Sequence, residues 1–136
     1  MRCIARNNFI TRAPEAGIVT VYTADCKLLN NTIHDPESRL RRLLRTVFTN
    51  DRLVIADNLL SGPGISSESD IAILFSNNLM KDMTDYFVNP DEGNLHLSGR
   101  PADVIDAGLA QAQVTGDIDR QPRGAKPDIG ADEVIN

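Results

Sequence analysis

Apolar residues recur along this chain at fixed distances from an asparagine. The asparagines are Asn8, Asn31, Asn58 and Asn78, separated by 23, 27 and 20 residues. An apolar residue stands five before each asparagine (Cys3, Cys26, Leu53, Ile73), three before it (Ala5, Leu28, Ile55, Phe75) and two after it (Ile10, Ile33, Leu60, Met80). Alternation with period two is typical of a strand that buries one face. Agreement between the columns predicts strands stacked in parallel as the coils of an all-β solenoid.

The asparagines themselves suit a bend between two strands. A tight bend needs a residue that tolerates the left-handed region, and after glycine that is usually asparagine. In coils stacked at strand spacing, the side-chain amides can also hydrogen-bond from one coil to the next. Alternatively, the asparagine pairs mark separate hairpin turns, but hairpins favour Asn-Gly, which does not occur here. We therefore predict an asparagine ladder.

Residues 34–47 interrupt the repeat and have two interpretations. Residues 35–37 (Asp-Pro-Glu) can start a helix, and four apolar residues follow at helical spacing, namely Leu40, Leu43, Leu44 and Val47. A polar turn followed by a strand around residues 43–48 would instead continue the solenoid, and we favour it. Four arginines would then project from one edge as a solvated loop or, alternatively, contact an acidic ligand or a neighbouring subunit: Arg39, Arg41, Arg42 and Arg45.

The two cysteines, Cys3 and Cys26, are 23 residues apart and occupy equivalent places in neighbouring coils. Stacked strands would bring them close enough for a disulfide. Cysteine is also among the residues most often buried, and the basic N-terminus has no apolar run of signal-peptide length. We therefore expect a cytoplasmic protein with two stacked free thiols, and the bridge is the alternative.

Composition narrows the classes of function. The 136 residues are enough for one domain, residues 1–136, and the aromatic fraction of 4% implies an aliphatic core. A net charge of −5 argues against a nucleic-acid partner, because such binding depends on neutralising phosphates. No apolar stretch approaches the roughly 20 residues of a membrane span. We expect no nucleic-acid and no membrane partner.

After Asn78 the repeat fades and distinctive motifs appear between residues 85 and 133. They read F-V-N-P, G-N-L-H-L, I-D-A-G, D-x-D-x-x-x-R and D-I-G-A-x-E. This order resembles the C-terminal end of bacterial right-handed parallel β-helix proteins, many of them pectate-lyase-like or similar to other polysaccharide lyases, and often secreted. The resemblance implies a short right-handed β-helix of about four to five coils. The asparagine coils would span residues 1–84, and the last coil with an irregular C-terminal cap would span residues 85–136.

The resemblance also assigns parts of the tail to that terminal structure and not to an active site, namely Asp117, Asp119, Arg123, Asp128 and Glu133. Two positions depart from the pattern: Asp132 stands where an aromatic residue is usual, and Arg120 where glycine is usual. Asp103 and Val104 also lengthen the usual S-P-A-I-D-A-G stretch. We therefore expect the local packing of the tail to differ from that of the resembling proteins.

No catalytic pattern is evident. The carboxylates of the tail could suggest calcium, but the frame of an EF-hand loop is missing, so we favour a structural role and expect no metal or cofactor. His34 and His96 have no nucleophile at motif spacing and are expected in turns or on the surface. The residues around Gly62 and Gly64 lack the Lys-Ser/Thr of a phosphate loop and form a turn.

Two functions are consistent with this pattern. The first is a non-enzymatic, truncated β-helix module with a structural or binding role. Its first coil has no visible cap at Met1, so it would self-associate there as a dimer or tetramer. The second is a carbohydrate-active enzyme or carbohydrate-binding module, a lyase or glycosidase supported only by the resemblance. We favour the first and name no catalytic or ligand-binding residues.

Overall fold

Three strands recur in each turn of the chain, in the computed structural model that describes residues 2–135. The first rung holds β1 (Cys3–Arg6), β2 (Phe9–Thr11) and β3 (Ile18–Ala24). The second holds β4 (Cys26–Leu29), β5 (Thr32–His34) and β6 (Leu44–Asp51). The third holds β7 (Val54–Ala56), β8 (Leu59–Ser61) and β9 (Ile65–Ser69), and β10 (Leu74–Ser76) and β11 (Leu79–Met80) begin a fourth.

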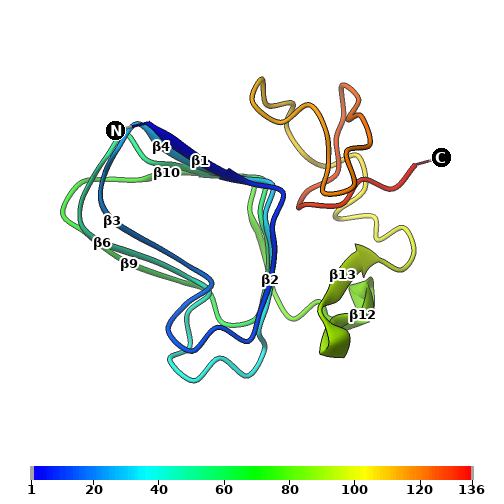
Figure 1. Ribbon diagram of the computed structural model, residues 1–136, viewed down its shortest axis with the longest axis horizontal. Helices are drawn as coiled ribbons and strands as arrows, with labels where there is room; N and C mark the ends of the chain where they lie inside the picture. Colours follow the sequence, from blue (N-terminus) through cyan, green and yellow to red (C-terminus); the bar gives the residue numbers. More distant parts are fainter. Residues whose placement is uncertain (1, 136) are drawn as a thin grey trace.

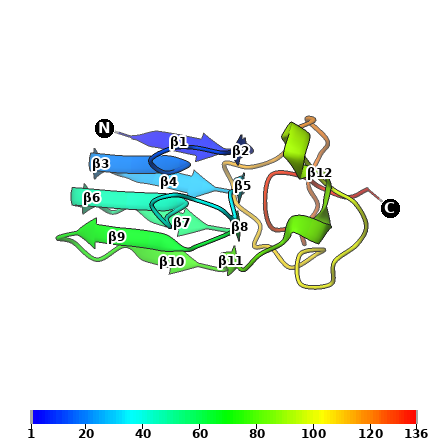
Figure 2. The same ribbon diagram turned by 90° about the horizontal axis from the view of Figure 1, so that it is seen from below.

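The strands form three parallel sheets, ordered β1-β4-β7-β10, β2-β5-β8-β11 and β3-β6-β9. The sheets surround one interior, and the rungs lie over one another (Figure 1). Figure 2 shows the same rungs side by side. The predicted all-β parallel solenoid is therefore confirmed, but it has about three turns, fewer than the four to five expected.

Stacking follows the apolar columns. Ala5 pairs with Leu28, Leu28 with Ile55, and Ile55 with Phe75. On the next sheet the paired residues are Ile10, Ile33, Leu60 and Met80. The middle members of these columns are buried in one aliphatic core together with Cys26, Leu43, Leu44 and Leu53. Each rung alone could not bury these side chains, so the stack itself supplies the core.

Two adjacent residues have different roles in each bend between the first two strands of a rung. The first residue of each pair adopts positive φ, at 55° for Asn7, 52° for Asn30, 56° for Asp57 and 60° for Asn77. The second residue points its amide along the stack. Nδ2 of each amide donates to the Oδ1 of the next, with distances of 2.8, 3.0 and 2.8 Å along the series Asn8, Asn31, Asn58 and Asn78. The left-handed residue is thus the neighbour of the amide that stacks.

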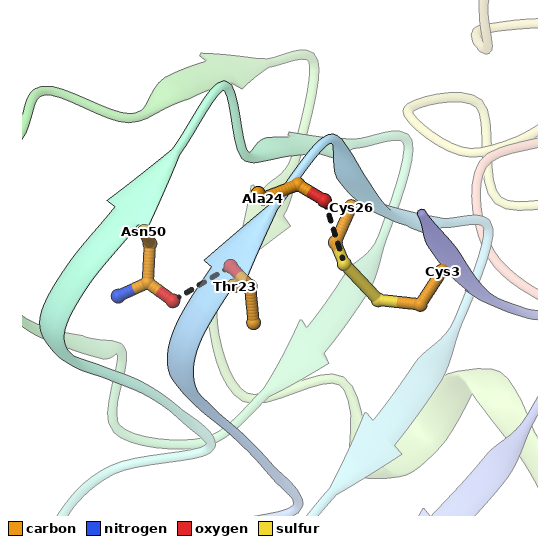
Figure 3. The surroundings of a disulfide bond; sticks show 5 residues. All are labelled: Cys3, Thr23, Ala24, Cys26 and Asn50. Atoms are coloured by element: carbon orange, nitrogen blue, oxygen red, sulfur yellow. Dashed lines mark hydrogen bonds between the residues drawn. A yellow bond between two sulfur atoms is a disulfide. The ribbon is translucent and has the colours of Figure 1, made fainter. Parts of the chain in front are cut away.

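Cys3 and Cys26 form a disulfide, so the expectation of free thiols is wrong (Figure 3). The two residues are direct partners on the parallel strands β1 and β4, with Cα atoms 4.5 Å apart. That separation lies within the range that a disulfide requires. The equal spacing of the cysteines fits either state, and the close in-register pairing allows the bond. The bridge covalently joins the first two rungs.

Residues 35–42 form turns and β6 begins at Leu44, which confirms the turn and strand that we favoured over a helix. The turn returns on itself through Ser38, whose Oγ accepts the Arg42 N–H at 3.2 Å. Gly62 passes beside this turn with φ of +145°, and an added Cβ would meet the Asp35 carbonyl oxygen at 2.5 Å. The lack of a side chain therefore lets two neighbouring rungs approach at this corner.

The C-terminal segment leaves the repeat after β11. It contains two 3-10 turns, η1 (Thr84–Tyr86) and η2 (Pro90–Glu92), and an antiparallel hairpin of β12 (Phe87–Asn89) and β13 (Asn94–Leu97). The remaining residues form turns and loops beside the sheet β2-β5-β8-β11 (Figures 1 and 2). Outward-facing Leu59 becomes buried in a second core under this segment, with Met83, Phe87, Leu95, Leu97, Val104 and Ile129.

This placement differs from the end cap that the resemblance implies. Gly130 N–H donates to the Asp57 carbonyl and Ala131 N–H to Thr32 Oγ1, so the tail is bound to the second and third rungs. A Cβ at Gly130, where φ is +93°, would lie 2.7 Å from Thr32 Oγ1, which shows how closely the backbone approaches. The irregular segment therefore covers the side of the solenoid.

Among residues 2–135, no helix has the length and apolar character needed to cross a membrane.

Candidate functional site

The tail is organised around a buried arginine, Arg123. Its Nη1 lies 2.9 Å from Glu133 Oε2, and the two side chains are 2% and 9% exposed. The same guanidinium donates to the carbonyls of Gly116, Asp128 and Gly130. Burial lowers the pKa of Arg123 and raises that of Glu133, and each charge offsets part of the cost for the other. The guanidinium therefore joins three backbone carbonyls of the tail to the Glu133 carboxylate.

Two aspartates bind backbone N–H groups of the same segment. Asp117 accepts from the backbones of Asp119, Gln121 and Glu133. Asp128 accepts from those of Asp106 and Val134. The tail residues assigned to terminal structure by resemblance thus include four that hold loops in place: Asp117, Arg123, Asp128 and Glu133. These carboxylates therefore fix the backbone of the segment.

Arg120 and Asp132, the two positions that depart from the resembling pattern, each have a distinctive conformation or environment. Arg120 stands at φ of +67°, the left-handed region where glycine is the usual residue. Asp132 is buried at 7% exposure, and its Oδ2 accepts the Leu97 N–H at 2.8 Å. Burial raises the pKa of Asp132. A carboxylate therefore lies buried inside the segment.

A cluster of His96, Asp119 and Asp132 lies on one side of the C-terminal segment. One ligand atom from each residue lies within 4.8 Å of the other two. His96, on β13, places Nε2 2.7 Å from Asp119 Oδ2 and Nδ1 2.6 Å from Asn94 Oδ1. Asp119 is thus a partly exposed member of this cluster and does not belong to the buried network.

His34 is buried on β5, so the expectation of a turn or surface residue is wrong for it. Its Nδ1 lies 2.8 Å from Ser61 Oγ, and its ring packs edge-on against Phe87 at 5.3 Å. Burial lowers the pKa of His34, although nearby Asp82, Asp35 and Asp91 oppose the shift. His96 is half-exposed on a strand.

A polar cleft of about 570 Å³ opens beside His34. Carboxylates dominate its lining, which comprises Thr11, Arg12, His34, Asp35, Pro36, Glu37, Asp82, Thr84, Pro90 and Asp91. Burial raises the pKa of Asp35, whereas hydrogen bonds from Thr84 lower that of Asp82. The cleft thus brings together two carboxyl groups, of Asp35 and Asp82, whose pKa values are shifted in opposite directions. Sequence spacing could not reveal this pair, because the two residues are 47 positions apart.

The four arginines of residues 39–45 do not converge on a common point. Arg42 pairs with Glu15 and Arg45 with Glu68, at 2.8 and 2.7 Å. Arg39 and Arg41 are exposed in the turn. Two of the four charges are thus neutralised within the chain, which matches the solvated loop better than a site for an acidic ligand.

The last rung leaves inward-facing apolar side chains in contact with solvent. Phe75 and Met80 are 43% and 51% exposed, whereas Ile55 and Leu60, one rung earlier in the same columns, are 0% exposed. Ile65, Phe75 and Met80 line a shallow hollow with Ser76, Asn77 and Asn78. The C-terminal segment lies to the side and leaves this end uncovered (Figure 2).

Comparisons with protein-family models, with curated proteins and with solved structures gave no match. The parallel β-solenoid follows from the strand pairing of this chain, and its function is inferred from its own geometry.

Proposed function

We propose that this chain is a non-enzymatic structural module that self-associates end to end through the rungs of its solenoid. The observation that carries the proposal is the exposure of Phe75 and Met80 in columns that are otherwise fully buried. Another rung placed against β10 and β11 would bury both side chains as Ile55 and Leu60 are buried. Exposed apolar groups beside unpaired strand edges favour association.

The partner that fits is the first rung of a second copy. The rungs of this chain pair in parallel and in register, apart from one shift between Val21 and Thr23 on β3. The free edges of β9, β10 and β11 and those of β1, β2 and β3 present the two sides of such a junction. Ala5 and Ile10 of one copy would then stack on Phe75 and Met80 of the next. The sequence predicted association at the first coil, and the last rung provides the surface to which that coil would bind.

The amide series supports the same direction of assembly. Within the chain the backbone N–H and Nδ2 of each asparagine both donate to the next Oδ1, as Asn31 does to Asn58 at 2.9 and 3.0 Å. Among the described residues, nothing donates to Asn8 Oδ1 and nothing accepts from the Asn78 N–H. The two ends are therefore complementary: donors at Asn78 would meet the acceptor at Asn8 of the next copy.

Head-to-tail contacts form a ring only when the rotation between copies closes, and rungs stacked along one axis instead give an open series. The expected assembly therefore grows with concentration and does not stop at a symmetric dimer. Sedimentation velocity over a range of concentrations tests this, with Phe75→Glu and Met80→Glu as variants that place a charge in the new interface. The matched control is Val88→Glu, at an exposed position of the C-terminal segment.

The wild type and the control should show a rising average mass, and both interface variants should remain monomeric with the same circular dichroism. A wild-type monomer at every concentration up to about a hundred micromolar overturns the proposal, as does an assembly unaffected by either charge.

The likeness to pectate-lyase-like β-helix proteins, and with it a carbohydrate-active role, belongs to a second candidate function. The polar cleft beside His34 favours it, because paired carboxylates are the groups that glycosidases use. Glycan-array binding and assays for turnover of uronate polymers test it. Turnover that Asp82→Asn abolishes would displace the structural proposal.

A further inference from the structure

We propose that His96, Asp119 and Asp132 form a binding site for a divalent transition-metal ion of the Zn²⁺ class. The three residues come from separate parts of the C-terminal segment, β13, the turn after Asp117 and the final loop, yet their ligand atoms converge within 4.8 Å. An imidazole with two carboxylates is a donor set that Zn²⁺ accepts, and three protein ligands leave a position for water. The proposal is independent of the end-to-end assembly.

The first reason is the environment of the His96 ring. Nδ1 faces Asn94 Oδ1, and this oxygen also accepts the His96 backbone N–H at 3.2 Å, so it is an acceptor and the Nδ1 atom must donate. In the neutral ring Nε2 then carries a lone pair, and this lone pair faces the Asp119 carboxylate at 2.7 Å. Two acceptors facing each other require a positive charge between them or on the ring.

The contact between His96 Nδ1 and Asn94 Oδ1 resembles the hydrogen bond that usually orients a metal-bound histidine. Such a histidine almost always donates its other ring N–H to an oxygen that fixes the tautomer and the ring orientation. Asn94 is placed for this task by β13 itself, two residues before His96. The Nε2 atom is consequently presented as the ligand.

The second reason is Asp132, an independently buried carboxylate. It is 7% exposed, and one oxygen accepts the Leu97 N–H. Within residues 2–135 no arginine or lysine pairs with it, and no hydrogen bond reaches its other oxygen. A buried anion without a cation is costly. A metal ion between Asp132 and His96 would supply the missing charge.

The geometry needs only a small adjustment. Ligand atoms bound to zinc at about 2.1 Å are separated by roughly 3.4 Å in a tetrahedral site. His96 Nε2 and Asp119 Oδ2 would therefore move apart from 2.7 Å, and Asp132 would close in from the other side. Asp119 and His96 are partly exposed, which gives the ion a route of entry.

Isothermal titration of the purified full chain with ZnCl₂ tests the site. We expect one Zn²⁺ per chain, and binding at least about tenfold weaker for His96→Gln and for Asp119→Asn. His34→Gln is the matched control, because His34 is the other histidine and also lies near carboxylates, Asp82, Asp35 and Asp91. It should bind as the wild type does. Circular dichroism of each metal-free variant checks that it is folded.

Asp132→Asn supplies a second measurement, in which the amide oxygen can still accept the Leu97 N–H. Without zinc this variant should melt at the same or a higher temperature than the wild type, since a buried uncompensated charge is removed. With zinc the wild type should gain stability and the variant should gain little. The proposal is overturned if the wild type shows no binding at submillimolar Zn²⁺, if His96→Gln leaves binding intact, or if only His34→Gln abolishes it.

Discussion

At the scale of single residues, Asn58 is, like Asn31, an interior member of the amide series whose side chain makes four hydrogen bonds. Its Nδ2 donates to Asn78 Oδ1 and the Leu28 carbonyl, and its Oδ1 accepts two N–H groups of Asn31. Asn58→Ala should lower the free energy of unfolding by on the order of 1–3 kcal/mol, because it leaves buried partners unpaired. Urea denaturation measures the loss.

Asn8→Ala is the matched control for this substitution. Asn8 is exposed, and its side chain donates only to Asn31. The loss should be smaller than that of Asn58→Ala, by about 1 kcal/mol or more. Equal losses at both positions would contradict a buried series whose interior members carry most of the stabilisation.

His34 gives the fold a dependence on pH. Since burial lowers its pKa below the ordinary 6.5, the unfolded chain binds a proton more readily than the folded chain does. Stability should therefore be complete above about pH 6.5 and should fall as the pH drops below that value. In His34→Gln, urea denaturation at about pH 7.5 and pH 5.5 should show a smaller difference than in the wild type. An unchanged difference would contradict this role.

At the scale of elements, the disulfide joins β1 to β4 and constrains the unfolded chain. For cysteines 23 residues apart, loop-closure entropy gives a stabilisation of roughly 3 kcal/mol. Cys3→Ala should lose this amount in urea denaturation, and the wild type with a reducing agent should approach the same value. A wild type that is indifferent to the reducing agent would restore the original expectation of free thiols.

The elements show what could be predicted from the sequence and what could not. The columns through Leu28 and Ile33 were predictable because period two and a constant register leave one arrangement that buries the inner face of every interior rung. The state of Cys3 and Cys26 was not, because equal spacing suits a thiol pair and a bridge alike. The position of the C-terminal segment also escaped prediction, since it lacks a period and its contacts, such as Gly130 with Thr32, span about a hundred residues.

The candidate sites were even harder to predict from the sequence. His96 and Asp132 are 36 residues apart in an irregular segment, and no spacing rule joins them. The one available signal was that Asp132 departs from the pattern of the resembling proteins. Such a departure marks a position without saying which residues surround it, because the partners are set by how the segment folds against the side of the solenoid.

At the scale of the whole molecule, Arg123 joins the tail to the repeat. Its Nη2 lies 3.2 Å from Asn7 Oδ1 in the first rung, and its Nη1 pairs with Glu133. Arg123→Met should lower stability by about 3–5 kcal/mol, since it leaves the Glu133 carboxylate buried without a cation, held only by the Asp128 N–H. Urea denaturation tests this, with Arg52→Met as a control, because Arg52 pairs with Asp25 and Asp51 on the surface and its loss should change little. Equal effects would contradict the role of Arg123.

Cross-linking between the end rungs of two copies tests directly whether they meet head to tail. Ile4 and Leu74 lie in one outward column, joined through Lys27 and Val54, and both are exposed. In a head-to-tail junction a cysteine at residue 4 of one copy would stand beside a cysteine at residue 74 of the next. The separation would resemble that of Cys3 and Cys26, whose Cα atoms are 4.5 Å apart.

Ile4→Cys and Leu74→Cys chains should therefore be mixed under mild oxidation and resolved on a non-reducing gel. With head-to-tail assembly, the mixture should give a covalent dimer and either chain alone should give little. A dimer from Leu74→Cys alone, or no dimer from the mixture at concentrations where the wild type self-associates, would contradict it.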